Sequence, residues 1–203
     1  MKNLKLLNKM LIALSSIINT VCIVLILLGN LESNILVCIS FYVLLIIPSI
    51  IRKFKLKFSD TLELIYLLFI ILACFLGSIL RFYGLIYWFD SFVHYISGML
   101  TAILAFVLLI YMKKYKEKDL NFHIVFMILV TLSVAACWEI FEFTADSLLD
   151  GDAQKVLETG VTDTMKDIIC ALLGSILVCI MYSYEYVNNK KLLITNFINS
   201  MKS

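Results

Sequence analysis

The chain has 203 residues, of which 62% are hydrophobic and only 16% are charged, and its mean hydropathy is +0.99. A soluble domain of this length is close to half apolar, so this composition excludes an ordinary soluble core and fits a protein whose solvent is lipid. The net charge of +2 is small, and no basic stripe with interleaved aromatic residues indicates a nucleic-acid partner.

Six apolar runs approach the length of a membrane span, because a spanning helix needs about 20 mostly apolar residues. The connectors between them are short, and the sequence contains no internal repeat. We therefore predict an all-α fold, in which residues 1–203 form one integral membrane domain, a polytopic bundle of about six transmembrane helices. The predicted helices cover roughly residues 10–29, 35–51, 62–80, 88–112, 121–146 and 163–186.

The first run has a basic start, which is also typical of a signal peptide. It is closer in length to a full span than to a short signal core, and no A-x-A cleavage site follows it, so we expect it to be the first helix. All six cysteines fall inside apolar runs without a CxxC pair. We expect them to be small packing residues rather than disulfide partners.

The lysine and arginine residues of the connectors predict the orientation, because cytoplasmic connectors carry an excess of them. With the N-terminus inside, 14 of the 17 lie on the inner side, and the asymmetry alternates at every connector. Only Arg81, Lys155 and Lys166 lie on the outer side. We predict that both termini are cytoplasmic and that the protein crosses the bacterial cell (inner) membrane several times.

Ionisable residues occur inside three predicted helix ends, all on the predicted outer side. Near the start of the fourth helix, Asp90 and His94 are four residues apart and therefore share a face. Asp163 and Asp167 do the same at the start of the sixth helix, where Gly174 allows close helix packing. The fifth helix ends with three acids on one face, which are Glu139, Glu142 and Asp146.

The depths of these groups match. At a rise of about 1.5 Å per residue, His94, Glu139 and Asp167 each lie roughly 6–10 Å below the outer end of their helix. An ionisable group inside a membrane costs on the order of 2.5–3.5 kcal/mol at mid-helix, so such groups persist where they face one another, water or an ion. We therefore expect three helices to share one negatively charged pocket that opens outward.

A divalent metal ion would balance this charge. Carboxylates with one imidazole suit Mg²⁺, Mn²⁺, Ca²⁺, Fe²⁺ or Zn²⁺, and the residue types leave the identity of the metal open. Beside the metal, Glu142 or Asp163 is the predicted general base. The alternative is a polar network without metal, in which Arg81 or Lys166 pairs with the acids. The predicted metal ligands are Asp90, His94, Glu139 and Asp167.

The remaining polar residues have simpler interpretations. We expect His123 to lie at the inner interface, near the inner end of the fifth predicted helix, where that helix begins. No cluster comparable to the outer one is expected on the inner side. Three acids are interpreted as ordinary connector charges, which are Glu32, Asp60 and Glu63.

The sequence resembles the bacterial YjdF-like family of uncharacterised inner-membrane proteins. The resemblance rests on Phe89-Asp90-x-x-x-His94-x-x-x-Gly98, on Trp138-Glu139-x-x-Glu142, and on Gly160-x-x-Asp163-x-x-x-Asp167 with Gly174 after it. It covers about the second half of the chain, and Thr162 stands where the family pattern has another acid. A looser similarity links the chain to VanZ-like membrane proteins. The resemblance supports the site and implies no particular activity.

Three functions remain open from the sequence. The first is a metal-dependent, membrane-embedded enzyme that acts on a lipid or envelope precursor, with the bilayer and a lipid-linked substrate as partners. The second is an ion-coupled or proton-coupled transporter, although the acids lie near one face rather than at the midplane where carriers place their sites. The third is a structural membrane factor in which a cation joins three helices. Substrate and oligomeric state are not predicted.

Overall fold

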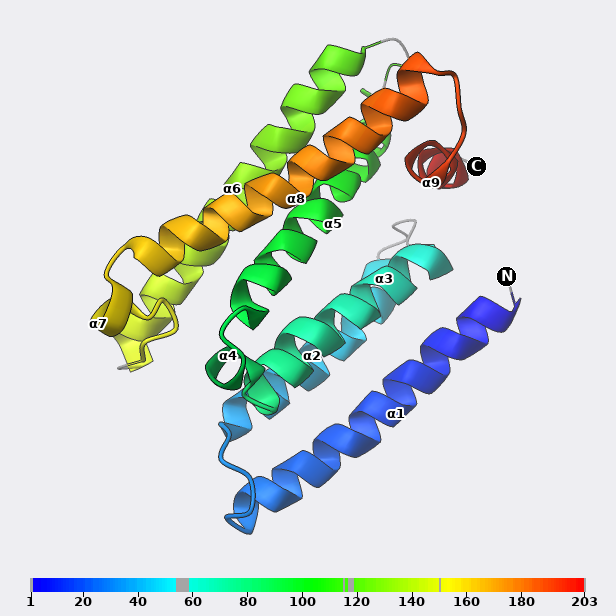
Figure 1. Ribbon diagram of the computed structural model, residues 1–203. Helices are drawn as coiled ribbons and strands as arrows, with labels where there is room; N and C mark the ends of the chain where they lie inside the picture. The colour runs from blue at the N-terminus through cyan, green and yellow to red at the C-terminus, as the bar shows by residue number, and fades with distance from the viewer. Residues whose placement is uncertain (1, 54–58, 115, 117–118, 150, 203) are drawn as a thin grey trace. The chain divides into compact units, whose positions relative to one another are not determined.

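The computed structural model describes residues 2–53, 59–114, 116, 119–149 and 151–202, which form helices and connecting turns with no strand among them (Figure 1). Contacts between residues divide the chain into two compact units, Met1–Phe89 and Asp90–Ser203. The first unit contains the first three predicted spans, and the second unit contains the last three.

Within the described residues, six helices are long and apolar enough to cross a membrane, which confirms the predicted all-α fold and the predicted number of spans. Large apolar side chains such as Leu14, Ile39 and Leu129 are exposed on them, as expected of surfaces that face lipid. In chain order the spans are α1 (Lys2–Leu27), α2 (Ile35–Lys53), α3 (Asp60–Ile70) with its continuation η1 (Ile71–Ile79), α5 (Phe89–Tyr111), α6 (Leu120–Leu149) and α8 (Thr162–Val187).

The described part of the chain has three further helices, which lie outside the predicted spans. Two are single turns within connectors, α4 (Phe82–Leu85) and α7 (Val156–Thr159), and the third, α9 (Leu193–Lys202), follows the last span. The first span also begins at Lys2 rather than near residue 10. Its polar flank remains helical because lysine and leucine are good helix formers, so the helix extends beyond the apolar run that predicted it.

The third predicted span, 62–80, changes its winding within the apolar run. Its second half, η1, is a π-helix, and the Leu80 N–H still donates to the Phe75 carbonyl five residues earlier, at 2.9 Å. This wider winding shifts the faces of the helix by one residue. Within it, Gly77 lies against the ring of Tyr83, which occupies the place that a Cβ atom would need.

A polar clamp joins three helices of the first unit, and the sequence did not predict it. The Glu63 carboxylate on α3 is only 3% exposed and receives both Arg52 guanidinium nitrogens from α2, at 2.9 and 2.8 Å. Asn8 on α1 donates to the same carboxylate at 2.8 Å, and Arg52 also reaches Asp60 at 3.1 Å. The interpretation of Asp60 and Glu63 as ordinary connector charges was therefore wrong.

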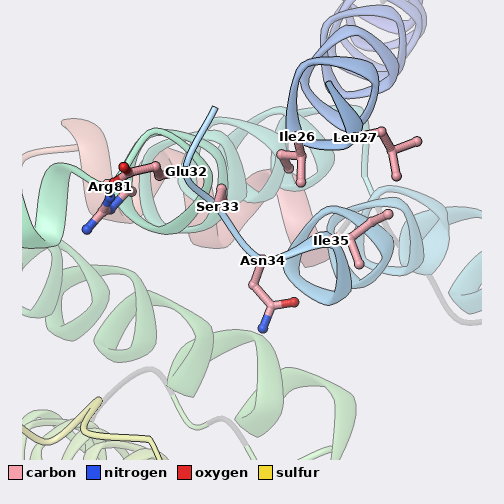
Figure 2. A pocket seen from close by; sticks show the side chains of 7 residues that line it. All are labelled: Ile26, Leu27, Glu32, Ser33, Asn34, Ile35 and Arg81. Carbon is pink, nitrogen blue, oxygen red and sulfur yellow. Dashed lines mark hydrogen bonds and ion pairs between the residues drawn. The ribbon is translucent and has the colours of Figure 1, made fainter. Parts of the chain in front are cut away.

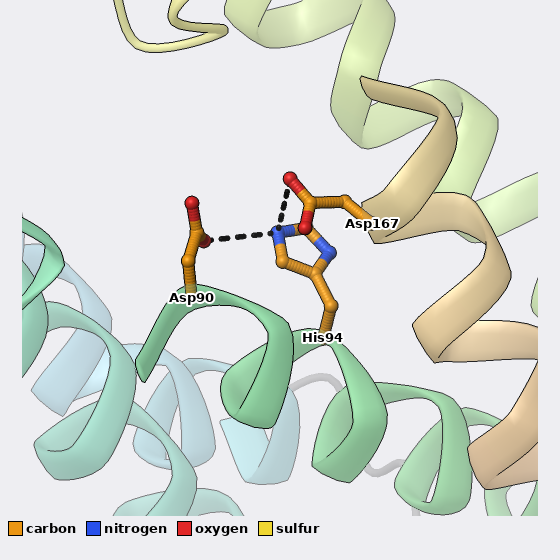
Figure 3. A group of neighbouring side chains, drawn as sticks. All are labelled: Asp90, His94 and Asp167. Carbon is orange, nitrogen blue, oxygen red and sulfur yellow. Dashed lines mark ion pairs between the residues drawn. The ribbon is translucent and has the colours of Figure 1, made fainter. Parts of the chain in front are cut away.

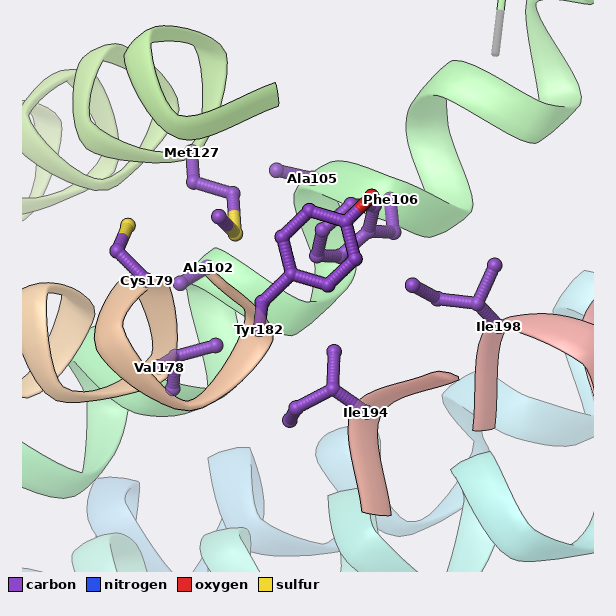
Figure 4. Packing of buried hydrophobic residues seen from close by; sticks show 9 residues of the cluster. All are labelled: Ala102, Ala105, Phe106, Met127, Val178, Cys179, Tyr182, Ile194 and Ile198. Carbon is purple, nitrogen blue, oxygen red and sulfur yellow. The ribbon is translucent and has the colours of Figure 1, made fainter. Parts of the chain in front are cut away.

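The second unit packs α5, α6, α8 and α9 around one apolar core (Figure 4). In Figure 1, α9 is seen nearly end-on while α8 runs across the view, so α9 turns away from the direction of α8. Its residues Ile194 and Ile198 are buried against the spans, together with Phe106 and Tyr182. The carboxylate of Glu185 accepts hydrogen bonds from the first backbone N–H groups of α9, at 3.0 and 2.7 Å.

His123 is buried beside this core. Its side chain is completely buried, its Nδ1 atom lies 2.9 Å from the Tyr182 hydroxyl, and its ring packs against Phe106. The sequence did not predict this burial between helices, and the placement of His123 at the depth of the inner membrane interface stays a prediction. All six cysteines are free, and Cys22, Cys38 and Cys179 are buried between helices, whereas Cys137 is exposed.

The orientation of the spans stays a prediction, and reporter fusions test it. Because lysine and arginine favour the cytoplasmic side, cytoplasmic reporters should be active after Lys53, Lys114 and Lys190. External reporters should be active at Asn34, Tyr83 and Asp152. A single connector with the opposite activity would contradict the arrangement with both termini in the cytoplasm.

Candidate functional site

Two predicted ligands come from the first turns of α5. Asp90 and His94 are one helical turn apart, and the Nε2 atom of His94 lies 3.5 Å from Oδ1 of Asp90 (Figure 3). Both side chains are nearly buried, so the imidazole faces the helix bundle of the second unit and not lipid. The shared face predicted from the spacing of four is present in the structure.

Asp167 on α8 joins them from the facing helix. One of its oxygens, Oδ2, lies 3.7 Å from the same Nε2 atom of His94 (Figure 3). One oxygen of each acid and a nitrogen of His94 all lie within 4.8 Å of one another. We call these three residues the Asp–His–Asp group. Asp167 is only 3% exposed, and its Oδ1 atom has no hydrogen-bond partner among the described residues.

Two glycines hold α5 and α8 close enough for this contact. A Cβ atom on Gly98 would collide with the backbone of Ala171, and a Cβ atom on Gly174 would collide with the backbone carbonyl of Tyr95. The two backbones therefore touch one to two turns below the Asp–His–Asp group. The predicted role of Gly174 in close helix packing is confirmed by these contacts.

Lys155, from the connector between α6 and α8, pairs with two acids of the site. Its ammonium group donates to Oδ2 of Asp90 and lies 3.3 Å from Oδ2 of Asp163. Burial disfavours the charge of Lys155, but the hydrogen bond to Asp90 and the negative charges of Asp90 and Asp163 outweigh burial and raise the pKa of Lys155. The ammonium group is therefore protonated at neutral pH.

In the metal-free polar network that the sequence offered as the alternative, Arg81 or Lys166 pairs with the acids of the cluster, and the structure instead pairs Arg81 with another acid. Arg81 belongs to the first unit, where it pairs with Glu32 in an exposed ion pair. This pair lies at the rim of an open pocket between the ends of α1 and α2 (Figure 2). Spacing along the chain could not separate Lys155 from the other two cations, because all three lie on the predicted outer side.

The connector itself folds back into the site. Asp146, at the end of α6, accepts hydrogen bonds from the backbone N–H groups of Ala153 and Gln154, at 2.8 and 3.1 Å. The buried Gln154 side chain then donates to the backbone carbonyl of Glu139 at 3.1 Å and lies 3.4 Å from its carboxylate. Asp146 thus shapes the connector, and Gln154 is a site residue that sequence reasoning missed.

The two glutamates of α6 lie beside the Asp–His–Asp group and are not part of it. Glu139 is buried and close enough to Asp167 to interact with its charge, yet it is absent from the set of ligand atoms within 4.8 Å. Glu142 receives a hydrogen bond from the indole of Trp138 at 2.8 Å and interacts with the charges of Glu139 and His94. The role of Glu139 as a metal ligand stays a prediction.

The cluster carries more negative than positive groups. Five carboxylates gather at this end of the second unit. Among the described residues, the cationic side chains near them are Lys155, Lys166 and, when it is protonated, His94. The carboxylates therefore outnumber the cations by at least two. A remaining negative charge in a low-dielectric site favours the uptake of a cation or of protons. The five acids are Asp90, Glu139, Glu142, Asp163 and Asp167.

The fold and this site define a class, which is that of multi-pass α-helical membrane proteins with a buried carboxylate–histidine cluster near one end of the spans. A family model described as "Predicted membrane protein (DUF2238)" matches residues 10–188, so the chain belongs to this family of membrane proteins. The match includes the whole Asp–His–Asp group. No curated protein and no solved structure matches the chain.

Proposed function

We propose that the Asp–His–Asp group binds a divalent metal ion, and that the protein is a metal-dependent enzyme of the bacterial cell membrane. The observation that carries the proposal is the geometry around His94 Nε2. Its distances of 3.5 and 3.7 Å to the two acids are too long for good hydrogen bonds. They are close to the spacing of neighbouring ligands around a tetrahedral ion with bonds of about 2.0–2.2 Å, which is roughly 3.3–3.6 Å.

A metal held by three protein ligands keeps positions open for water or substrate, which is the arrangement of catalytic zinc sites. The metal would lower the pKa of a bound water or polarise a phosphoryl or carbonyl oxygen. Among the predicted bases, Asp163 is paired with Lys155, whereas Glu142 receives a hydrogen bond from the neutral indole of Trp138 and is the better candidate. We propose that Glu139 either binds the metal as a further ligand or contributes negative charge beside the Asp–His–Asp group.

The proposed substrate is a lipid or envelope precursor. Trp138 and Phe141, one turn apart on α6, are both at least half exposed beside Glu142. Apolar exposed rings next to a polar cluster fit a substrate that carries its reacting group on a lipid chain. Within the DUF2238 family, we propose that the chain belongs with the YjdF-like proteins, which its sequence resembles, and that those proteins share the same site.

Removing the metal should lower the melting temperature of the purified protein strongly. A ligand that binds only the folded state stabilises it by RT ln(1 + [L]/Kd), which is about 2.7 kcal/mol at a hundredfold excess over Kd. Chelation followed by thermal denaturation measures the loss, and addition of one divalent metal should reverse it. Asp167→Asn should abolish the response, while Glu139→Gln should weaken it less.

Glu158→Gln is the matched control, because Glu158 is an exposed acid of the α7 turn in the same connector. Its metal response should equal that of the native chain. The proposal would be contradicted if chelation left the melting temperature unchanged while Lys155→Met lowered it. That result would indicate a salt-bridge network in place of a metal site. Activity is measured as metal-dependent release of phosphate from vesicles that contain a polyprenyl diphosphate. If the metal stabilises the protein but no phosphate is released, the result favours a structural role of the cation over hydrolysis of this class of substrate.

A further inference from the structure

The two oxygens of the Asp90 carboxylate have different neighbours. Oδ1 lies 3.5 Å from Nε2 of His94 and faces the Asp–His–Asp group. Oδ2 instead accepts a hydrogen bond from the ammonium group of Lys155. Only one oxygen of Asp90 is therefore directed toward the position between the three side chains.

Lys155 is held in place from several sides. Its backbone adopts a left-handed conformation with φ of 50°, which residues with a side chain rarely adopt unless the surrounding structure holds them there. The two residues before it are fixed by the carboxylate of Asp146, and its ammonium group is fixed again by Asp163 on α8. The contact with Asp90 is thus built into the connector and is not one position of a free surface lysine.

We propose that Lys155 determines which metal ion the Asp–His–Asp group prefers, by keeping Asp90 a single-oxygen ligand; this inference rests on the metal site proposed above. A Ca²⁺ ion takes six to eight oxygen ligands and commonly uses both oxygens of a carboxylate. Zn²⁺ and similar ions take fewer ligands, bind imidazole nitrogen well and accept one oxygen from each acid. Lys155 therefore selects against Ca²⁺ and is a positioning residue for Asp90.

A pair of substitutions separates this positioning from the simple loss of a charge. Lys155→Met and Lys155→Gln both remove the positive charge, but only glutamine retains a hydrogen-bond donor for Oδ2 of Asp90. The experiment measures Kd for Zn²⁺, Mn²⁺ and Ca²⁺ by thermal shift with the purified full chain. Lys155→Met should raise the affinity for Ca²⁺ relative to Zn²⁺ by roughly tenfold, while Lys155→Gln should change this ratio much less.

Lys166→Met is the charge-matched control, because Lys166 lies on α8 between Asp163 and Asp167 and interacts electrostatically with that region. It should change the affinities for Zn²⁺ and Ca²⁺ by the same factor and leave their ratio unaltered. An unchanged ratio in Lys155→Met would overturn the role of Lys155 while leaving the metal site intact. A native chain that responds to none of the three ions would overturn the metal site and this inference together.

If Lys155→Met fails to fold, Lys155→Arg provides a second test. Arginine retains the charge and the donors on a longer, planar group, so it should keep Asp90 a single-oxygen ligand. Its ratio of Zn²⁺ to Ca²⁺ affinity should stay at or above that of the native chain. A shift of this ratio toward Ca²⁺ in Lys155→Arg would contradict the proposal.

Discussion

Replacing Arg52 with methionine is expected to lower the free energy of unfolding by about 3 kcal/mol or more. Removing one partner of a buried ion pair leaves the other charge uncompensated, which typically costs about 3–5 kcal/mol. The Glu63 carboxylate is only 3% exposed and receives two guanidinium nitrogens. Because the Arg52 side chain itself is 34% exposed, we expect a value toward the lower end of this range.

Equilibrium unfolding in mixed detergent micelles measures this change, and the chain contains its own control. Arg81 and Glu32 form a second arginine–glutamate pair in the same unit, with side chains that are 55% and 88% exposed. Exposed pairs contribute only about 0–1 kcal/mol, so Arg81→Met should change stability little. Equal losses in Arg52→Met and Arg81→Met would contradict the buried clamp.

A double substitution tests the cause of the loss. In Arg52→Met combined with Glu63→Leu, no unpaired charge remains, and a well-packed apolar replacement of a buried pair is often close to neutral. The double variant should therefore be more stable than Arg52→Met alone. Asn8 would lose its hydrogen bond to the carboxylate, so recovery should be partial.

Gly98→Ala should destabilise the second unit by about 3 kcal/mol and remove its metal response. The added Cβ atom would meet the backbone of Ala171, and backbone atoms cannot turn aside as a flexible side chain can. Overpacking of this kind costs about 1–3 kcal/mol, and occasionally more. Separation of α5 from α8 would also move His94 away from Asp167, which come from these two helices.

Gly84→Ala is the matched control, because no atom lies within 4 Å of the Cβ position of Gly84. The same substitution there should leave the melting temperature unchanged or slightly raised, since alanine restricts the unfolded chain. Gly174→Ala should resemble Gly98→Ala, because its Cβ would meet the carbonyl of Tyr95. If Gly98→Ala has the melting temperature of the native chain and still responds to metal, the close contact between α5 and α8 does not support the site.

The Asp–His–Asp group combines two residues of one helix with a third residue from a distant helix. Asp90 and His94 share a face by helical periodicity alone, so their pairing followed from the sequence. Asp167 joins them across two helices, and matched depth together with Gly174 made this contact predictable as well. Glu139 was expected at the same centre, but rotation about the axis of α6 determines how closely its carboxylate approaches, and chain spacing does not specify that rotation.

The sequence by itself determined the features that depend on the length of the apolar runs and on helical periodicity. Apolar runs of nearly span length can be hidden only in lipid as helices, because each backbone group must be satisfied within its own segment. For this reason the all-α fold and the six spans were predictable, although polar flanks and the winding of η1 were not. Spacings of three, four and seven residues likewise assign side chains to common faces.

Only the tertiary structure decided which polar groups meet across the chain. Lys155 and Arg81 look alike in the sequence, yet a connector folded over α5 brings the first to Asp90, whereas the second pairs with Glu32. Glu63 appeared to be a connector charge until Arg52 was placed beside it. The physical reason is that a charged side chain can be buried only with a partner, and the identity of that partner depends on how helices pack and connectors turn.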